Sequence, residues 1–311
     1  MEVRNQTSVT EFLLSGLVDD PSLNYLFFLI FLLMYLITLL GNISMITLIC
    51  CSSKLRNPMY FFLCHLSFSD VCYSSVITPK ILSNMVSKRM VISFQGCAAQ
   101  LFFFALFVGA ECFLVTVMAY DRYVAICYPL LYVMIMSRDL QLKLVGMAYS
   151  GGLITSIIHT SCTFRLSFCN SNKVNHLYCD IPPLLKLSCT NTSMSELFMF
   201  LLSSILGTFS LLIILISYGN IISSILKIKS SDGRLKAFST CSSHLLVVIL
   251  FFGTAIFVYI RPISSHSIQT DKVISLFYTV VIPLLNPIIY SLRNIQVRSA
   301  FMNIMSKAFY S

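Results

Sequence analysis

The 311-residue chain is 57% hydrophobic and only 11% charged, and its mean hydropathy is +0.85. Soluble domains carry about 25% charged residues, so this composition cannot cover a water-facing surface and indicates a membrane protein. The net charge of +9 gathers at one side of the apolar segments, which favours a topological role over nucleic-acid binding.

Seven apolar segments are long enough to cross a hydrocarbon core, which needs roughly 20 residues per helix. They cover residues 24–50, 58–81, 97–121, 141–163, 196–223, 238–261 and 272–292. The last two are the least regular, because His244, Pro283 and Pro287 interrupt them. The alternating ten-residue pattern of membrane strands does not occur. The sequence therefore predicts an all-α membrane protein, a seven-transmembrane helix bundle (24–292).

Basic residues predict the orientation. With residues 1–23 outside, the inner loops and tail hold twelve basic and three acidic residues, against nine and seven on the outer side. Positive residues prefer the cytoplasm, where lipids are anionic. We therefore expect the N-terminus outside, the C-terminus inside and contact with membrane lipid. The polar start lacks a cleavable signal pattern, so the first apolar segment is expected to be an uncleaved anchor.

The predicted outer side carries glycosylation and disulfide signals. Asn5 begins an Asn-Gln-Thr sequon, and Asn191 begins a second one close to a membrane entry. The long extracellular loop, residues 164–195, contains Cys169, Cys179 and Cys189, and Cys97 opens the third segment on the same side. Four outer cysteines allow three pairings, and spacing alone does not choose among them. Free thiols are the alternative.

The cytoplasmic tail, residues 293–311, places apolar residues at roughly helical spacing with basic residues between them. This pattern predicts a short amphipathic helix on the inner leaflet after the seventh span. A frayed tail is the alternative.

Two acids lie inside predicted spans, where charges are costly and usually functional. At 1.5 Å per residue, Asp70 is about 18 Å and Glu111 about 16 Å above the inner ends of their helices. Asn42 is at a similar depth, and Asn286 is somewhat nearer the cytosol. Two close carboxylates either share a proton or bind a cation, and both alternatives stay open.

A third polar feature is the stretch MAYDRYVAIC, residues 118–127, where an apolar run meets charge. Asp121 and Arg122 are adjacent there, and tyrosines flank them. An acid and a base at the inner mouth of a membrane helix suit a charge switch.

Further motifs occur in order along the chain. They are Gly41-Asn42, PMYFFLCHLSFSDVCYSS (58–75), CDIPPLLKLSC (179–189), SYGN (217–220), KAFSTCSSHL (236–245) and PLLNPIIYSLRN (283–294). Together with MAYDRYVAIC they resemble the odorant (olfactory) receptors, of the tetrapod class II type, in the rhodopsin-like (class A) G-protein-coupled receptor family. The resemblance covers almost the full chain.

The resemblance implies a multi-pass plasma-membrane receptor rather than an enzyme. It would bind small odorants and activate a stimulatory G protein, which raises cyclic AMP. The resemblance also implies the disulfides Cys97–Cys179 and Cys169–Cys189. It favours a sodium ion at Asp70 and Glu111, and no other cofactor.

The resemblance further implies a ligand pocket in the outer half of the bundle. The matching positions are Phe104, Ala105, Val108, Gly109, Cys112, Met199, Leu202, Ser203, Leu206, Phe252, Ile256, Tyr259, Leu276 and Thr279. Amine receptors carry an acid near Phe104, and this chain does not, so a small, neutral, mostly apolar volatile is expected. For any one of these residues, helix packing is an equally good interpretation.

The chain also departs from other rhodopsin-like receptors. It has no Trp, and Phe252 occupies the region of the sixth-segment Trp. A lysine in the core of the seventh segment, which retinal would need, is absent. Tyr128 and Leu131 replace the His and Arg common after the signature, which puts the details of G-protein contact in doubt.

At the cytoplasmic end, the resemblance implies a switch. Its residues are Asp121, Arg122, Tyr123, Tyr218, His244, Asn286 and Tyr290. The foot of the sixth segment lacks the acid found in many such receptors, so Arg122 is expected to be held mainly by Asp121. His244 could alternatively be a satisfied polar residue without a switching role.

Two other functions compete with a receptor. A proton- or ion-coupled transporter could use the buried acids, but transporters usually show inverted repeats, which this chain lacks. A membrane enzyme would need a nucleophile–base pair or a metal cluster beside the acids, and the sequence offers neither.

Overall fold

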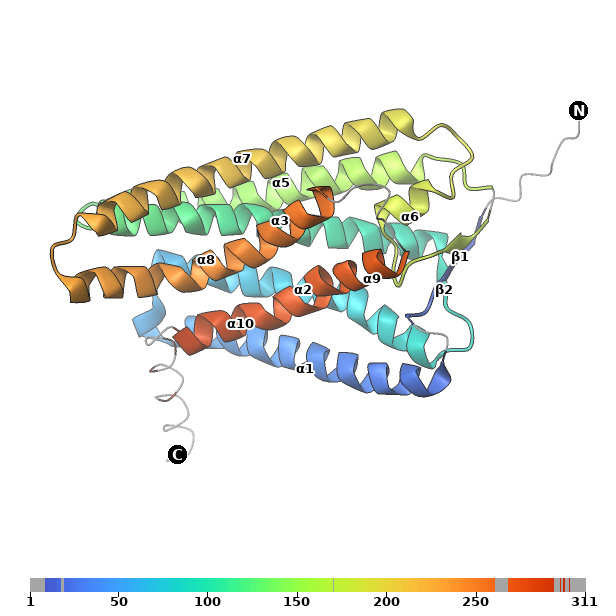
Figure 1. The fold of residues 1–311 in the computed structure, drawn as a ribbon, viewed down its shortest axis with the longest axis horizontal. Helices are drawn as coiled ribbons and strands as arrows, with labels where there is room; N and C mark the ends of the chain where they lie inside the picture. Colours follow the sequence, from blue (N-terminus) through green and yellow to red (C-terminus); the bar gives the residue numbers. More distant parts are fainter. Residues whose placement is uncertain are drawn as a thin grey trace, which may run out of the picture.

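The computed structural model describes residues 9–17, 20–169, 171–260 and 268–293, together with Val297, Ser299 and Met302. Within these residues, seven long helical segments run alongside one another (Figure 1). They are α1 (Pro21–Cys51), α2 (Pro58–Val86), α3 (Phe94–Cys127), α5 (Arg138–Phe164), α7 (Ser193–Leu226), α8 (Ser231–Ile260) and a last segment made of α9 (Ile268–Leu276), the π-helical turn η3 (Phe277–Val281) and α10 (Ile282–Arg293). Short helices η1 (Ser53–Leu55), α4 (Tyr132–Ile135) and α6 (Ile181–Leu185) lie in the connections.

Each predicted span falls on one of these helices, and most helices extend beyond the apolar run that predicted them. By length and hydropathy, five segments of the described chain could cross a membrane, namely α1, α2, α3, α7 and the last one. α8 has a shorter apolar stretch, Cys241–Ile256. Apart from Arg293, Val297, Ser299 and Met302, the tail helix expected over 293–311 lies outside the described residues, as do the sequon residue Asn5 and residue 261 at the end of the sixth span.

Local sequence signals begin several helices. Pro58 occupies the first turn of α2, and Asn57 Oδ1 accepts a hydrogen bond from Met59 N at 3.0 Å. Ser93 caps α3 through Gly96 N at 3.0 Å. These side chains bond backbone N–H groups that have no partner within the helix, so each helix starts at a defined residue.

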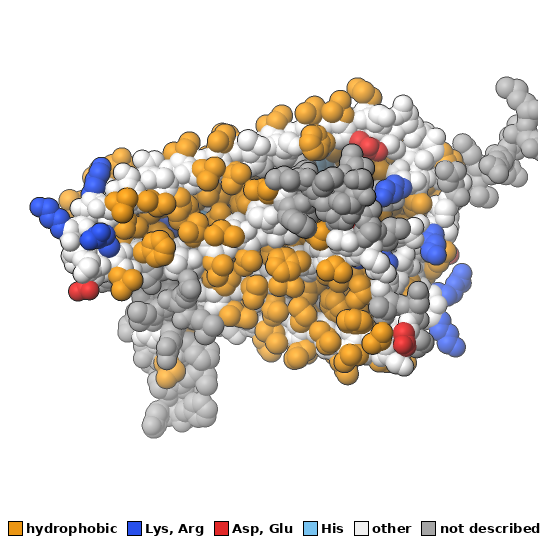
Figure 2. All heavy atoms as spheres, viewed as in Figure 1, with side chains coloured by type: hydrophobic (Ala, Val, Ile, Leu, Met, Phe, Trp, Pro, Cys, Tyr) orange, Lys and Arg blue, Asp and Glu red, His pale blue; other side chains and the backbone are white. Residues whose placement is uncertain are grey.

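The surface of the bundle is apolar around its middle. Figure 2 shows a broad hydrophobic face, with basic and acidic side chains gathered toward the two ends of the molecule. Large apolar side chains such as Leu29, Leu40 and Leu215 are 58–67% exposed. A soluble protein rarely exposes such a large continuous apolar surface, so this face is suited to lipid.

A small sheet covers one end of the bundle. Strand β1 (Glu11–Leu14) pairs antiparallel with β2 (Val91–Ser93) and parallel with β3 (Lys173–Val174). Phe12 is fully buried in this sheet. The sequence analysis treated residues 1–23 as a plain extracellular segment and did not predict these strands.

Two disulfides fix the long loop at the same end. Cys97 at the start of α3 is bonded to Cys179, and Cys169 is bonded to Cys189. These are the two pairings that the family resemblance implied. The first bond ties the centre of the loop to the bundle, and the second closes the loop on itself.

The closest helix packing joins α3 to α5 through small residues. A Cβ atom at Gly109 would lie 3.0 Å from Gly152 Cα, and one at Gly152 would lie 2.7 Å from Ala110 N. Small residues let membrane helices approach closely. The sequence SGG at residues 150–152 therefore sets how near α5 lies to the functional helix α3.

Candidate functional site

A cavity of about 590 Å³ lies within the bundle between α3, α5, α7 and α8, beside the loop at Asp180 and Ile181. Small-molecule sites usually have volumes of about 300–1,000 Å³ and mostly apolar linings. Its lining includes the α3 residues Leu101, Phe104, Ala105, Val108, Gly109, Cys112 and Phe113 and the α8 residues Phe251, Phe252, Ala255 and Ile256. The size and lining suit a small organic ligand.

Most residues expected to contact a ligand line this cavity. They are Phe104, Ala105, Val108, Gly109, Cys112, Ser203, Leu206, Phe252 and Ile256. Met199 lines a neighbouring cavity instead. Gly109 also packs against Gly152, so its smallness serves helix packing as well.

Three expected residues are placed differently, and a fourth is not described. Leu202, Leu276 and Thr279 are absent from the described lining of both cavities. Leu276 packs among apolar residues such as Phe31 and Tyr73, and the Thr279 hydroxyl donates to Ser275 O at 2.7 Å within its own helix. The side chain of Tyr259 lies outside the described part of the structure.

The polar lining of the cavity lies mainly on α5 and α7, and the sequence analysis missed most of it. Thr155 and His159 come from α5, and Ser204 and Thr208 join Ser203 on α7. Helical periodicity could not reveal these residues, since it does not show which polar positions turn toward the bundle interior. The cavity therefore has apolar walls on α3 and α8 and a polar wall opposite them.

A second cavity of about 740 Å³ adjoins the first on the loop side. The two share His159, Asp180, Ile181, Phe200 and Ser203 as lining residues. The second cavity also carries the charged residues Lys186 and Glu196. It is thus a more polar space leading to the apolar one.

The long loop is held firmly beside these cavities. Cys179 N donates to Gln100 Oε1 on α3 at 2.9 Å, next to the disulfide. The hydroxyls of Tyr178 and Tyr278 lie 3.0 Å apart and link the loop to η3. Asp180 Oδ1 accepts from Ile181 N at 2.8 Å. The loop is consequently part of the cavity wall.

The two intramembrane acids meet below the cavity. Asn286 Nδ2 lies 3.0 Å from Asp70 Oδ2 and 3.3 Å from Glu111 Oε1, so one amide joins both carboxyl groups. Asp70 and Glu111 are at most 1% exposed. Glu111 Oε2 and Asn286 Oδ1 are buried without a hydrogen-bond partner among the described residues. This set of oxygen atoms fits a hard cation such as sodium, and it equally fits a shared proton.

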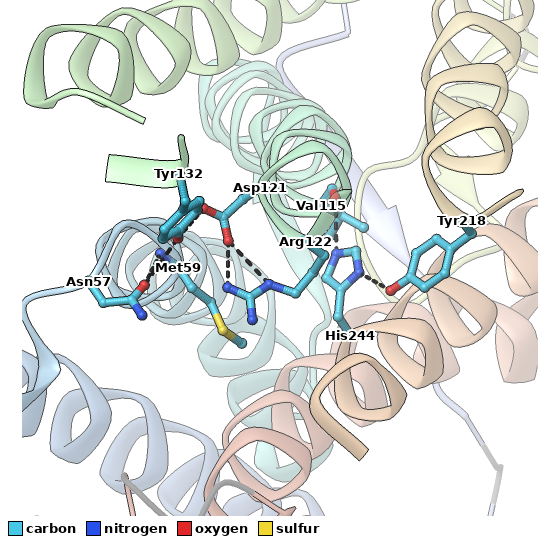
Figure 3. A network of polar contacts seen from close by, with 8 residues as sticks. All are labelled: Asn57, Met59, Val115, Asp121, Arg122, Tyr132, Tyr218 and His244. Atoms are coloured by element: carbon cyan, nitrogen blue, oxygen red, sulfur yellow. Dashed lines mark hydrogen bonds and ion pairs between the residues drawn. The ribbon is translucent and has the colours of Figure 1, made fainter. Parts of the chain in front are cut away.

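A network around Arg122 lies near the end of α3 that is opposite to Cys97 and the long loop. Figure 3 shows its polar contacts. Arg122 Nη2 and Nε lie 2.6 Å and 3.2 Å from Asp121 Oδ2. The Tyr132 hydroxyl donates to Asp121 Oδ1 at 2.8 Å. Among the described residues, Asp121 is the one acid in ion-pair contact with Arg122. The sequence analysis did not identify Tyr132.

His244 connects three helices beside this network, as Figure 3 shows. Its Nε2 lies 3.1 Å from Val115 O on α3, and its Nδ1 lies 2.7 Å from the Tyr218 hydroxyl on α7. A carbonyl only accepts, so Nε2 carries the proton in a neutral ring and Tyr218 donates to Nδ1. Both ring nitrogens are therefore satisfied, and α8 is tied to α3 and α7.

The other expected switch residues make fewer polar contacts. The Tyr290 hydroxyl is fully buried and lacks a hydrogen-bond partner in the described chain. The Tyr123 hydroxyl lies 3.3 Å from the Tyr128 hydroxyl. Both tyrosines leave hydrogen-bonding capacity for another arrangement of the helices.

Comparison with known proteins agrees with this architecture. The family model described as "Olfactory receptor" matches residues 31–308. The chain belongs to the olfactory receptor family.

Individual relatives are similar over nearly the whole chain. Olfactory receptor 5AR1 of Mus musculus is 51% identical and the match covers 99% of each chain. Olfactory receptor 5G3 of Homo sapiens is 54% identical over 97% of this chain and 96% of that receptor. In the crystal structure of squid rhodopsin, 18% identity accompanies a TM-score of 0.71 over 93% of this chain and 87% of that one. The last likeness shows the fold alone.

Membership of the olfactory receptor family makes this chain a multi-pass plasma-membrane G-protein-coupled receptor. The family takes small-molecule ligands and couples to G proteins, and its members are not enzymes. The comparisons give no support to a transporter.

Proposed function

We propose that this receptor binds small, neutral, mostly apolar volatile molecules in the 590 Å³ cavity and activates a stimulatory G protein, which raises cyclic AMP. The observation that carries this proposal is the cavity at one end of α3 and the Asp121–Arg122 pair at the other. A single helix thus contacts both the ligand space and the cytoplasmic network.

The lining supports the proposed ligand class. Aromatic and aliphatic side chains of α3, α7 and α8 dominate the lining of the cavity. The carboxyl group of Asp180 also lines it, and a negative charge there disfavours odorants that carry a carboxylate. The two Asp180 oxygens accept from Ile181 N at 2.8 Å and from the Tyr278 hydroxyl at 3.5 Å.

The proposed output depends on the closed arrangement of α3, α7 and α8. Asp121 holds Arg122, and His244 ties the three helices together. A ligand that favours separation of α8 from α3 would break the His244 bond to Val115 O and open the cytoplasmic end. Only a ligand that binds the open arrangement more tightly can shift the equilibrium.

We further propose that Asp70, Glu111 and Asn286 hold a sodium ion in the resting state. The Asn286 amide contacts both carboxyl groups, and the buried oxygens Glu111 Oε2 and Asn286 Oδ1 have no hydrogen-bond partner among the described residues. These two oxygens could bind the ion, which supports the proposal. A shared proton is the competing occupant, and its binding would answer to pH rather than to sodium concentration.

The proposed orientation places the sheet and the long loop outside and the Arg122 network in the cytosol. The excess of basic residues in the loops at the Arg122 end supports it. In this orientation Asn5 is available for glycosylation, and the tail 293–311 lies on the inner leaflet.

Cyclic AMP measurement in transfected cells tests the function. Cells that display the receptor at their surface, shown by labelling an N-terminal tag without permeabilisation, are exposed to a panel of neutral odorants. A concentration-dependent rise in cyclic AMP is expected for some members. A surface-expressed receptor that raises cyclic AMP with none of them, while a known olfactory receptor responds in the same cells, contradicts the proposal.

A further inference from the structure

The polar wall of the cavity contains one side-chain pair that bridges two helices. His159 Nε2 on α5 lies 3.2 Å from Ser203 Oγ on α7. Both residues line the 590 Å³ cavity and also the adjoining 740 Å³ cavity. The pair therefore lies at the junction of the two spaces.

Beside this pair, one further hydroxyl group of the lining is already bonded. The Thr155 hydroxyl donates to Gly151 O at 2.8 Å in its own helix. On the opposite side, the α3 and α8 walls present Phe104, Phe252 and similar apolar side chains. One polar pair facing two apolar walls is an arrangement that orients a ligand with one polar end.

Resting on the proposed function, we propose that the His159–Ser203 pair is the polar anchor that determines ligand specificity, and that it selects odorants with one hydroxyl or carbonyl oxygen on a hydrocarbon skeleton. The odorant oxygen binds at the pair, and the hydrocarbon part lies against α3 and α8.

The chemistry of the pair explains why both oxygen types are accepted. A neutral imidazole has one donor and one acceptor nitrogen, and a hydroxyl has one donor and two acceptor sites. When Ser203 donates to Nε2, its oxygen accepts from an odorant hydroxyl. When Nε2–H donates to Ser203, the serine proton is free for an odorant carbonyl. A hydrocarbon can neither donate to nor accept from the pair. It would displace water from the pair without replacing the hydrogen bonds that the water made.

The test compares matched odorants on matched variants. The odorants are sets with one carbon skeleton, such as octanol, octanal and octane with octylamine, and cyclic equivalents. The variants are Ser203→Ala and His159→Phe, with Ser203→Thr as the conservative replacement. Ser223→Ala is the control, since Ser223 is an exposed serine on the same helix and lines neither cavity. Surface labelling and cyclic AMP are measured for each.

The inference predicts that Ser203→Ala raises the half-maximal concentration of oxygenated activators about three- to tenfold, the effect of one lost hydrogen bond. Any response to the hydrocarbon changes much less. Ser203→Thr keeps the response, His159→Phe resembles Ser203→Ala, and Ser223→Ala leaves the response near that of the unmodified receptor.

Other outcomes overturn the inference in distinguishable ways. Equal shifts for oxygenated odorants and hydrocarbons mean that the pair only joins two helices. Activation by octylamine that is lost in Asp180→Asn moves the anchor to Asp180. Responses restricted to hydrocarbons exclude a polar anchor. A receptor at the surface that answers to no odorant contradicts the proposed function itself.

Discussion

Asn42 donates its side-chain amide to the backbone carbonyl oxygen of Pro283, at 3.1 Å, and so joins α1 to α10. In a regular helix this carbonyl would accept from the residue four positions on, which is Pro287 and has no N–H. Asn42 therefore satisfies a buried carbonyl that the second proline leaves free. The adjacent Gly41 makes room, because a Cβ there would lie 3.0 Å from Pro287 Cγ.

Replacing Asn42 with Ala should destabilise the receptor by about 1–3 kcal/mol, since it leaves a buried carbonyl without a partner. Thermal unfolding of the purified receptor in detergent measures this. Thr47→Ala is the control, because Thr47 is on the same helix and its hydroxyl bonds only the helix carbonyl of Ile43. Equal melting temperatures for Asn42→Ala and the control would show that the carbonyl finds another partner.

Gly152→Ala should reduce stability and surface expression strongly. The added methyl group would meet Leu106 O and lie 2.7 Å from Ala110 N, and both belong to the α3 backbone, which cannot move independently. Gly146→Ala is the matched control on the same helix, because nothing lies within 4 Å of its added Cβ. That control should be neutral or stabilising by up to about 1 kcal/mol. A Gly152→Ala receptor as stable as Gly146→Ala would mean that α3 and α5 separate easily.

Sequence patterns predicted the long helices well, because membrane spans carry a strong local signal. The strand at residues 11–14 was missed, since a four-residue strand is defined by partners at 91–93 and 173–174 rather than by its own composition. Most of the ligand residues carried over from the resemblance line the cavity, and their role in ligand binding stays a prediction. No sequence signal indicated that His159 lines the cavity. This residue lies outside every quoted motif, and helical spacing alone does not show which residues of other helices surround it.

His244→Phe should raise basal cyclic AMP about two- to tenfold, because it removes the bonds to Val115 O and Tyr218 that tie α8 to α3 and α7. Tyr218→Phe removes one of these two bonds and should have a smaller effect. His65→Phe is the control, since the same substitution is made on α2 away from the network. Unchanged basal signalling in His244→Phe, at matched surface levels, would make His244 a satisfied polar residue without a switching role.

Glu111→Gln should raise basal signalling in sodium buffer and abolish its dependence on sodium. The substitution keeps a carbonyl for Asn286 Nδ2 but removes one of the two charges available to a cation. Basal cyclic AMP is compared in sodium and in a large organic cation of equal ionic strength, with Glu196→Gln as the control. A response to pH without a response to sodium would favour the shared proton. A variant that changes neither removes the proposed site.

His176, in the long loop, should make the receptor less stable in acid. Burial lowers the pKa of His176 below its usual 6.5, although the nearby Asp180 opposes the shift. The ring is 3% exposed and its Nδ1 lies 3.2 Å from Tyr178 O. The unfolded chain therefore binds a proton near pH 6.5 that the folded loop binds only at lower pH.

The sign of the pH effect follows from this difference. Below about pH 6.5 the unfolded state holds more protons than the folded state. The free energy of unfolding therefore decreases as the pH is lowered, by at most about 1.4 kcal/mol per pH unit. The loss ends once the folded ring is also protonated. Thermal unfolding from pH 7.5 to 5.5 should show this slope in the unmodified receptor and a flatter one in His176→Gln, which cannot gain the charge. Parallel slopes for the two would assign the acid sensitivity to other groups.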